Sequence, residues 1–315
     1  MNIRSILAVT DFSKQADWAL ERAAQLAVEH RATLKLMFAP ANGNAPPADG
    51  ASRLAHTARA LSTRLAITVR TANQTANTLH HVAEEAACAD LLVLGYQRES
   101  ALATFLRGQT AERLARLCRC PVLVTKLAPK GRYGRILVAV DFTPESRNMV
   151  KLACVLDADA EVELFHAIST LNEARLRCAE ASAQAVKAYR QECLRYARHR
   201  ILALTDSFDS RRNRVMSKVS HGDPARQAAI QQEYVGADLL VVGKRRRLPF
   251  MTFFLGSVSQ RVLYWATSDV LIVPHDAQAS TRVAAIQRME AEMGDAKGAF
   301  RRLKGRPTRA ALALK

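Results

Sequence analysis

The sequence predicts an α/β protein made of two similar domains, each a five-stranded parallel sheet flanked by helices. Three observations support this prediction: the length of the chain, an internal repeat, and short apolar segments that alternate with helical patterns. The chain has 315 residues, which exceeds one ordinary domain, and 49% of them are hydrophobic. Two domains with buried cores are therefore expected.

Two pairs of segments form the repeat. An apolar run that ends in Asp-Phe-Ser, residues 6–13, returns at residues 136–143 with Asp-Phe-Thr at its end. A run that begins Ala-Asp-Leu-Leu-Val and ends in Gly, residues 89–95, returns at residues 237–243. The interval is larger for the second pair, so the second domain carries an insertion. We expect it to be one helix from about 172 to 204, because its apolar residues share one helical face: Val186, Cys193, Leu194, Ala197, Ile201 and Leu204.

Short runs rich in Val, Ile and Leu predict the strands. They lie at 3–9, 32–38, 67–71, 90–95 and 121–125, and again at 135–141, 159–165, 214–220, 238–243 and 270–274. Helical patterns fill the intervals, as in the βαβ units of a parallel sheet. We expect Ser13 and Thr143 to cap the helices that follow the first strands, with Pro144 in the first helical turn.

The predicted domains are residues 1–128 and 134–275, followed by a basic tail at 276–315 that is helical or disordered. Glycines interrupt any regular element in the linker between the domains. The formal charge of +17 would attract polyanions but identifies no partner. Part of the excess lies in the tail and in the basic run at 244–247.

Composition also predicts the surroundings of the protein. No apolar run is long enough to span a bilayer and no leader with a cleavage site is recognisable, so we expect a cytoplasmic protein without a membrane partner. The six cysteines are scattered without a CxxC pair. This pattern predicts reduced, buried thiols and no metal site.

Taken together, the motifs resemble the universal stress protein family in its tandem, two-domain form, UspA-like or UspE-like. The resemblance rests on the Asp-Phe-Ser/Thr strand ends, the two Ala-Asp-Leu-Leu runs, and Leu-Gly-Ser-Val-Ser at 255–259 before a closing strand, and it covers residues 3 to 275. It implies two Rossmann-like domains of the HUP/UspA type that pack through their last strands as an intramolecular pseudo-dimer. Whether two chains dimerise further stays open.

The resemblance also implies a site. In an open parallel sheet, ligands bind beyond the carboxyl ends of the strands, where the strand order reverses. Family members that bind ATP carry a loop G-x2-G-x9-G-(S/T) there, because glycines and a helix start let the backbone approach phosphate. The second domain retains most of this loop, so ATP is implied there only. The implied binding residues are Val140, Asp141, Ala167, Gly243, Arg246, Gly256, Ser257 and Val258.

Departures from the pattern leave alternatives open. Arg246 replaces the middle glycine, so its side chain either excludes the phosphates or contacts them directly. Asp141 serves equally well as a turn cap, and Gly243 as a turn residue. In the first domain Arg98 and Gln109 replace loop residues, and no tight ATP site is expected there. His221, before a Gly-Asp-Pro turn, is interpreted as part of a helix start.

Three functions remain under consideration, none of them catalytic, because no GxxxxGK[ST], GxGxxG or GxSxG motif occurs at a suitable place. The first is a stress-response protein that binds adenine nucleotide and acts on protein partners. The second is a protein interaction module that needs no nucleotide. The third is polyanion or nucleic-acid binding through the basic tail and the run at 244–247, which ranks last because no aromatic stripe or nucleic-acid motif accompanies the charge.

Overall fold

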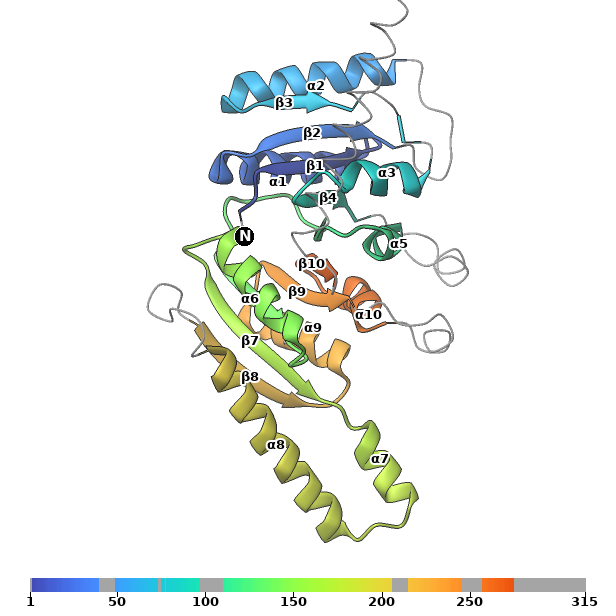
Figure 1. The fold of residues 1–315 in the computed structure, drawn as a ribbon, viewed down its shortest axis with the longest axis vertical. Helices are drawn as coiled ribbons and strands as arrows, with labels where there is room; N and C mark the ends of the chain where they lie inside the picture. Colours follow the sequence, from blue (N-terminus) through green and yellow to red (C-terminus); the bar gives the residue numbers. More distant parts are fainter. Residues whose placement is uncertain are drawn as a thin grey trace, which may run out of the picture. The chain divides into compact units, whose positions relative to one another are not determined.

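The computed structural model describes residues 2–39, 49–72, 75–76, 78–96, 110–205, 215–244 and 257–274. Its strands form one ten-stranded sheet in the order β3-β2-β1-β4-β5-β10-β9-β6-β7-β8 (Figure 1). The first half contributes β1 (Ser5–Thr10), β2 (Thr33–Phe38), β3 (Val69–Thr71), β4 (Leu91–Gly95) and β5 (Val122–Thr125). The second half contributes β6 (Arg135–Ala139), β7 (Glu161–Ile168), β8 (Val215–His221), β9 (Leu239–Lys244) and β10 (Asp269–Pro274).

All neighbouring strands within each half are parallel, and the halves join through their last strands. β5 and β10 pair antiparallel, with Leu123 opposite Leu271. The joint is therefore a pseudo-two-fold arrangement, as the family resemblance implied. The predicted α/β fold with two five-stranded parallel units is confirmed.

Helices cover both faces of the sheet, so most strands are buried on both sides. One core contains side chains from α1 (Lys14–His30), α2 (Gly50–Leu65), α6 (Pro144–Leu156) and α8 (Ala183–Thr205). The other contains side chains from α3 (Leu79–Ala86), α5 (Thr110–Leu117), α9 (Pro224–Val235) and α10 (Val258–Trp265). Along β4, Leu91 and Val93 face the first core while Leu92 and Leu94 face the second. This two-sided burial explains why the strands are continuous apolar runs instead of alternating ones.

The single helix predicted for the insertion is wrong, because the segment forms two helices, α7 (Leu171–Cys178) and α8 (Figure 1). The chain turns between them at Glu180, whose φ is 55°, and the hydroxyl of Ser182 accepts a hydrogen bond from the backbone N–H of Ala185 in α8. The expected apolar face of α8 is correct, since Val186, Ala197 and Ile201 are buried.

The two expected helix caps have different outcomes. The Ser13 hydroxyl accepts a hydrogen bond from the Ala16 N–H at 3.2 Å, as predicted. The Thr143 cap is wrong, because the Thr143 hydroxyl instead donates to the Asp141 carboxylate at 2.6 Å. A stronger acceptor two residues earlier in the chain takes the hydroxyl away from the helix. Pro144 occupies the first turn of α6 as expected.

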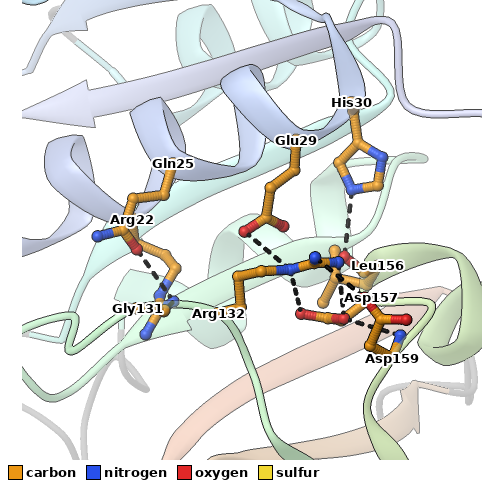
Figure 2. Close-up of polar contacts among 9 residues, drawn as sticks. All are labelled: Arg22, Gln25, Glu29, His30, Gly131, Arg132, Leu156, Asp157 and Asp159. Carbon is orange, nitrogen blue, oxygen red and sulfur yellow. Dashed lines mark hydrogen bonds and ion pairs between the residues drawn. The ribbon is translucent and has the colours of Figure 1, made fainter. Parts of the chain in front are cut away.

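Charged side chains connect the halves on the amino side of the sheet (Figure 2). Arg132, in the linker, donates two hydrogen bonds to the Asp157 carboxylate of the second half, at 3.0 and 3.2 Å. Its Nε lies 3.5 Å from the Glu29 carboxylate of α1, so the guanidinium bridges the two halves. Arg22 of α1 donates to the carbonyl of Gly131. We call Glu29, Arg132 and Asp157 the amino-side bridge.

Composition led to expectations about membrane spans and about the burial of the cysteines. Among the described residues, none of the helices combines the length and the apolar character needed to cross a membrane. Cys118 and Cys120 are buried as expected, but the other thiols are not: Cys178 at the end of α7 is exposed, and Cys88, Cys154 and Cys193 are half-buried.

Candidate functional site

The strand order of the second half reverses between β6 and β9, which are neighbours. Val140 and Asp141 directly follow β6, and Gly243 lies near the carboxyl end of β9. Parallel strands bring these ends to the same edge of the sheet, so three of the predicted site residues gather where open α/β sheets bind ligands. We call this edge the second rim, and the equivalent edge of the first half the first rim.

A strained turn holds Asp141 at the second rim. Its Oδ1 accepts hydrogen bonds from the Thr143 N–H, the Thr143 hydroxyl and the Ser146 hydroxyl, at 3.2, 2.6 and 3.1 Å. Phe142 between them has a φ of 60°, a left-handed conformation that is costly for a bulky residue. The carboxylate therefore acts as a turn cap, which is the alternative that the sequence left open.

The His166 ring lies beside this turn at the end of β7. It stacks against the Phe142 ring with centroids 4.2 Å apart, and its Nδ1 donates to the Val140 carbonyl at 2.8 Å. Burial lowers the pKa of His166, although the Val140 carbonyl and the Asp141 carboxylate act against the shift. The imidazole is therefore neutral at pH 7, with Nε2 as its hydrogen-bond acceptor. Ala167 follows in the same strand and is half-buried.

Helix α8 supports the turn from the other side, which the sequence did not predict. The Arg200 guanidinium donates to the Phe142 carbonyl at 2.9 Å, and the Tyr196 ring meets the Phe142 ring edge-on at 6.2 Å. No local signal marks these two residues, because both contacts join segments more than 50 positions apart.

Ser257 caps α10, and its hydroxyl is already engaged. It accepts from the Gln260 N–H at 3.2 Å and from the Lys244 ammonium at 2.9 Å. Lys244 also donates to the Glu112 carboxylate of α5, at 2.7 Å, and the Ser257 hydroxyl donates to the same carboxylate oxygen at 3.3 Å. A carboxylate of the first half thus faces the residues expected to hold phosphate in the second. Val258, the next predicted site residue, begins α10 with 40% of its surface exposed.

The Lys244–Glu112 pair is nearly inaccessible, with Glu112 1% and Lys244 5% exposed. Burial by itself raises the pKa of Glu112, but the Lys244 ammonium and the Arg116 guanidinium outweigh this effect and hold the pKa below its ordinary value. Glu112 is therefore an anion at neutral pH. Lys244 opens the basic run at 244–247 that the sequence offered for polyanion binding, but its buried ammonium pairs with Glu112 inside the protein and does not face a partner.

The structure explains one loop glycine by packing. Gly95, the first-rim equivalent of Gly243, lies so close to α1 that an added Cβ would stand 2.5 Å from the Gln15 carbonyl oxygen. This close approach needs no ligand to account for it. Arg246 and Gly256 lie outside the described residues, as do Arg98, Gln109 and the predicted tail.

His221 belongs to a structural cluster. It pairs with the Glu173 carboxylate of α7, which also accepts two hydrogen bonds from the Arg190 guanidinium of α8, at 2.7 and 3.2 Å. Asp223 caps α9 through the Arg226 N–H at 2.9 Å, in line with the predicted helix start. Within the described residues no group of His, Cys, Asp or Glu is arranged to hold a metal ion.

Comparison with known proteins decides the family. The model described as the Universal stress protein family matches residues 2–126 and 132–274, which is most of the chain and both repeats. The chain belongs to the universal stress protein family. Universal stress protein Rv2005c of Mycobacterium tuberculosis is 29% identical over 191 residues, which cover 58% of this chain and 61% of that relative. The match thus spans less than two thirds of the relative's length.

Two solved structures share the fold of this universal stress protein. One is the functionally unknown protein PA1789 from Pseudomonas aeruginosa PAO1, with a TM-score of 0.62, 22% identity and coverage of 90% of this chain and 98% of that one. The other is a universal stress protein from Archaeoglobus fulgidus, with a TM-score of 0.60, 15% identity and coverage of 87% and 97%. At these identities the likeness concerns the fold alone.

Proposed function

We propose that this universal stress protein is a cytoplasmic stress-response protein whose second rim binds an adenine nucleotide, ATP in the first place, without turning it over, and that the bound nucleotide alters its association with protein partners. Binding would use the strand ends at Asp141 and Ala167 for the nucleoside and the start of α10 at Ser257 and Val258 for the phosphates. The predicted loop residues Gly243, Arg246 and Gly256 would complete the phosphate contacts.

The observation that carries the proposal is the convergence of these groups at the reversal of strand order. The second rim brings together a carboxylate at the end of β6, a neutral imidazole at the end of β7, and a helix start with a hydroxyl cap and a lysine beside it. Hydrogen-bond donors and acceptors beside the stacked rings of Phe142 and His166 suit a nucleoside. The start of a helix suits an anion such as phosphate.

One observation favours a different function. The Ser257 hydroxyl and the Lys244 ammonium already have the Glu112 carboxylate as a partner, so the anion site is satisfied from within the chain. A protein interaction module that needs no nucleotide, the second function considered from the sequence, would have this property. The burial of Lys244 removes one positive charge from the surface that polyanion binding would use.

Calorimetric titration of the full chain with ATP and Mg²⁺ tests the proposal. The structure offers a matched pair of variants, since Ser257 and Ser13 each cap a helix through one N–H at 3.2 Å. Ser13→Ala should cost about 1 kcal/mol of folding stability. Ser257→Ala should cost more, because the Ser257 hydroxyl also bonds Lys244 and Glu112, but only Ser257→Ala should weaken ATP binding. No heat at millimolar ATP, or equal weakening by both variants, would refute nucleotide binding at the second rim.

A further inference from the structure

The contact of Glu112 with the second rim is unlike an ordinary surface ion pair. Surface pairs exchange partners with water, but this carboxylate and its lysine are both almost fully buried. Glu112 comes from α5 of the first half. Its carboxylate bonds Lys244 and Ser257, which belong to the second half. The contact therefore joins the halves on the carboxyl side of the sheet, opposite the amino-side bridge.

The donors around Glu112 are those that a phosphate oxygen would use. A lysine ammonium, a serine hydroxyl and the start of a helix are a common set of anion-binding groups. The Glu112 Oε1 takes the first two at 2.7 and 3.3 Å. A second anion cannot share these donors cheaply, because two negative charges about 4 Å apart in a buried place repel strongly.

The arrangement is specific to one rim. The repeat that aligns Gly95 with Gly243 also aligns Tyr96 with Lys244 and Gln260 with Glu112. The pseudo-symmetric counterpart of the ion pair is therefore a tyrosine and a glutamine, both uncharged. A contact that served only to pack two similar halves would be expected at both rims. The Lys244–Glu112 ion pair instead occurs at the rim that carries Ser257.

We propose that Glu112 is an internal stand-in for phosphate, which an incoming nucleotide must displace from Ser257 and Lys244, so that binding at the second rim releases α5 of the first half. This inference rests on the proposed nucleotide site and adds its regulation. After displacement Glu112 keeps Arg116, whose guanidinium lies 2.7 Å away with half of its side chain exposed. The displaced carboxylate can therefore remain paired with the half-exposed Arg116 guanidinium.

The test uses inorganic pyrophosphate and ATP as separate probes, with calorimetry for affinity and hydrogen exchange of α5 for release. Pyrophosphate should raise amide exchange across Thr110–Leu117 in the natural protein. Glu112→Gln should bind pyrophosphate about tenfold more tightly, within the usual range of coupling between sites. Glu29→Gln, which changes a carboxylate of the amino-side bridge instead, is the matched control and should leave affinity unchanged.

The outcomes separate the two proposals. Equal pyrophosphate and ATP affinities for Glu112→Gln and the natural protein, with unchanged exchange in α5, would overturn the displacement. Tighter pyrophosphate binding without any ATP binding would leave displacement standing and refute the nucleotide function. If Glu112→Gln fails to fold, Glu112→Asp keeps the charge but withdraws the carboxylate by one methylene. Its affinity for pyrophosphate should then exceed that of the natural protein by less than the roughly tenfold expected for Glu112→Gln, and an unchanged affinity would overturn the displacement.

Discussion

The turns that follow β1 at the first rim and β6 at the second rim share a backbone conformation but differ in their side chains. In both, an aspartate follows the first strand and precedes a phenylalanine in the left-handed conformation, with φ of 62° at Phe12 and 60° at Phe142. The strand register places Phe38 opposite Thr10 in the first half, and His166 takes the equivalent position in the second. Phe12 stacks on Phe38 at 4.9 Å between centroids, whereas Phe142 stacks on a histidine.

This difference shows what the fold requires and what it leaves free. The turn and an aromatic partner occur in both halves, so they serve the α/β framework. The imidazole, the hydroxyl cap of α10 and the Lys244–Glu112 pair lie at the second rim. Among the described residues, His166 and Lys244 of the second rim thus stand where the first rim has Phe38 and Tyr96.

The largest effect is expected for the residue that follows the loop glycine. Lys244→Met takes the buried ammonium away from the Glu112 carboxylate, which keeps the Arg116 guanidinium as a counter-ion, and should lower the free energy of unfolding by about 3 kcal/mol. Tyr96→Met, at the equivalent place in the first half, removes a contact with the Lys126 ammonium 4.4 Å from the ring centroid and should cost about 1 kcal/mol. Urea denaturation measures the free energy of unfolding of both variants. Equal losses would show that the Lys244–Glu112 pair stabilises the fold no more than the uncharged contact of the first half.

The two strand-end aspartates should differ by a smaller amount. Asp141 accepts hydrogen bonds from the Thr143 N–H and from the hydroxyls of Thr143 and Ser146. Asp11 accepts from the Ser13 N–H at 3.0 Å, and the position equivalent to Ser146 is Ala16, which has no hydroxyl to donate. Asp141→Ala should therefore destabilise by about 2 kcal/mol and Asp11→Ala by about 1 kcal/mol. Thermal unfolding of both variants measures the difference, and a larger loss for Asp11→Ala would contradict the assignment of the turn bonds.

The insertion of the second half should respond to acid without global unfolding. The Arg190 guanidinium, with a smaller effect from His221, lowers the pKa of Glu173 to about 2. Because this lies below the ordinary value of about 4.3, the ionised carboxylate stabilises the α7 contact above about pH 4, and that stabilisation is lost as the pH falls toward 2. Hydrogen exchange in α7 should rise over this interval. Glu173→Gln should remove the pH dependence, and an unchanged profile in that variant would refute this origin.

Much of the fold was predictable because its signals are local. Runs of Val, Ile and Leu placed all ten strands close to their observed bounds, and the repeat revealed the two halves. The break between α7 and α8 was missed, because the segment around Glu180 and Ser182 contains no glycine or proline. The Thr143 cap failed because Asp141, two residues away, competes for the hydroxyl.

The site was less predictable, because its side chains come from distant segments. The positions of Asp141, Ala167 and Ser257 follow from strand ends and a family motif. Glu112 and Lys244 lie 132 residues apart in sequence, and they come close because β5 and β10 join the two halves antiparallel. A charge pair of this kind cannot be found from spacing, so the sequence assigned Lys244 only to a basic run that could bind polyanions.

Native mass spectrometry of the full chain with ATP tests the central claim most directly, using His166→Phe to give the second rim the aromatic pair of the first. The fold should survive, since Phe12 and Phe38 already form that stack. The account predicts one ATP per chain for the natural protein and a clear loss of that adduct in His166→Phe. Two equivalent adducts, or one adduct that His166→Phe leaves unchanged, would contradict an adenine-nucleotide site at the second rim.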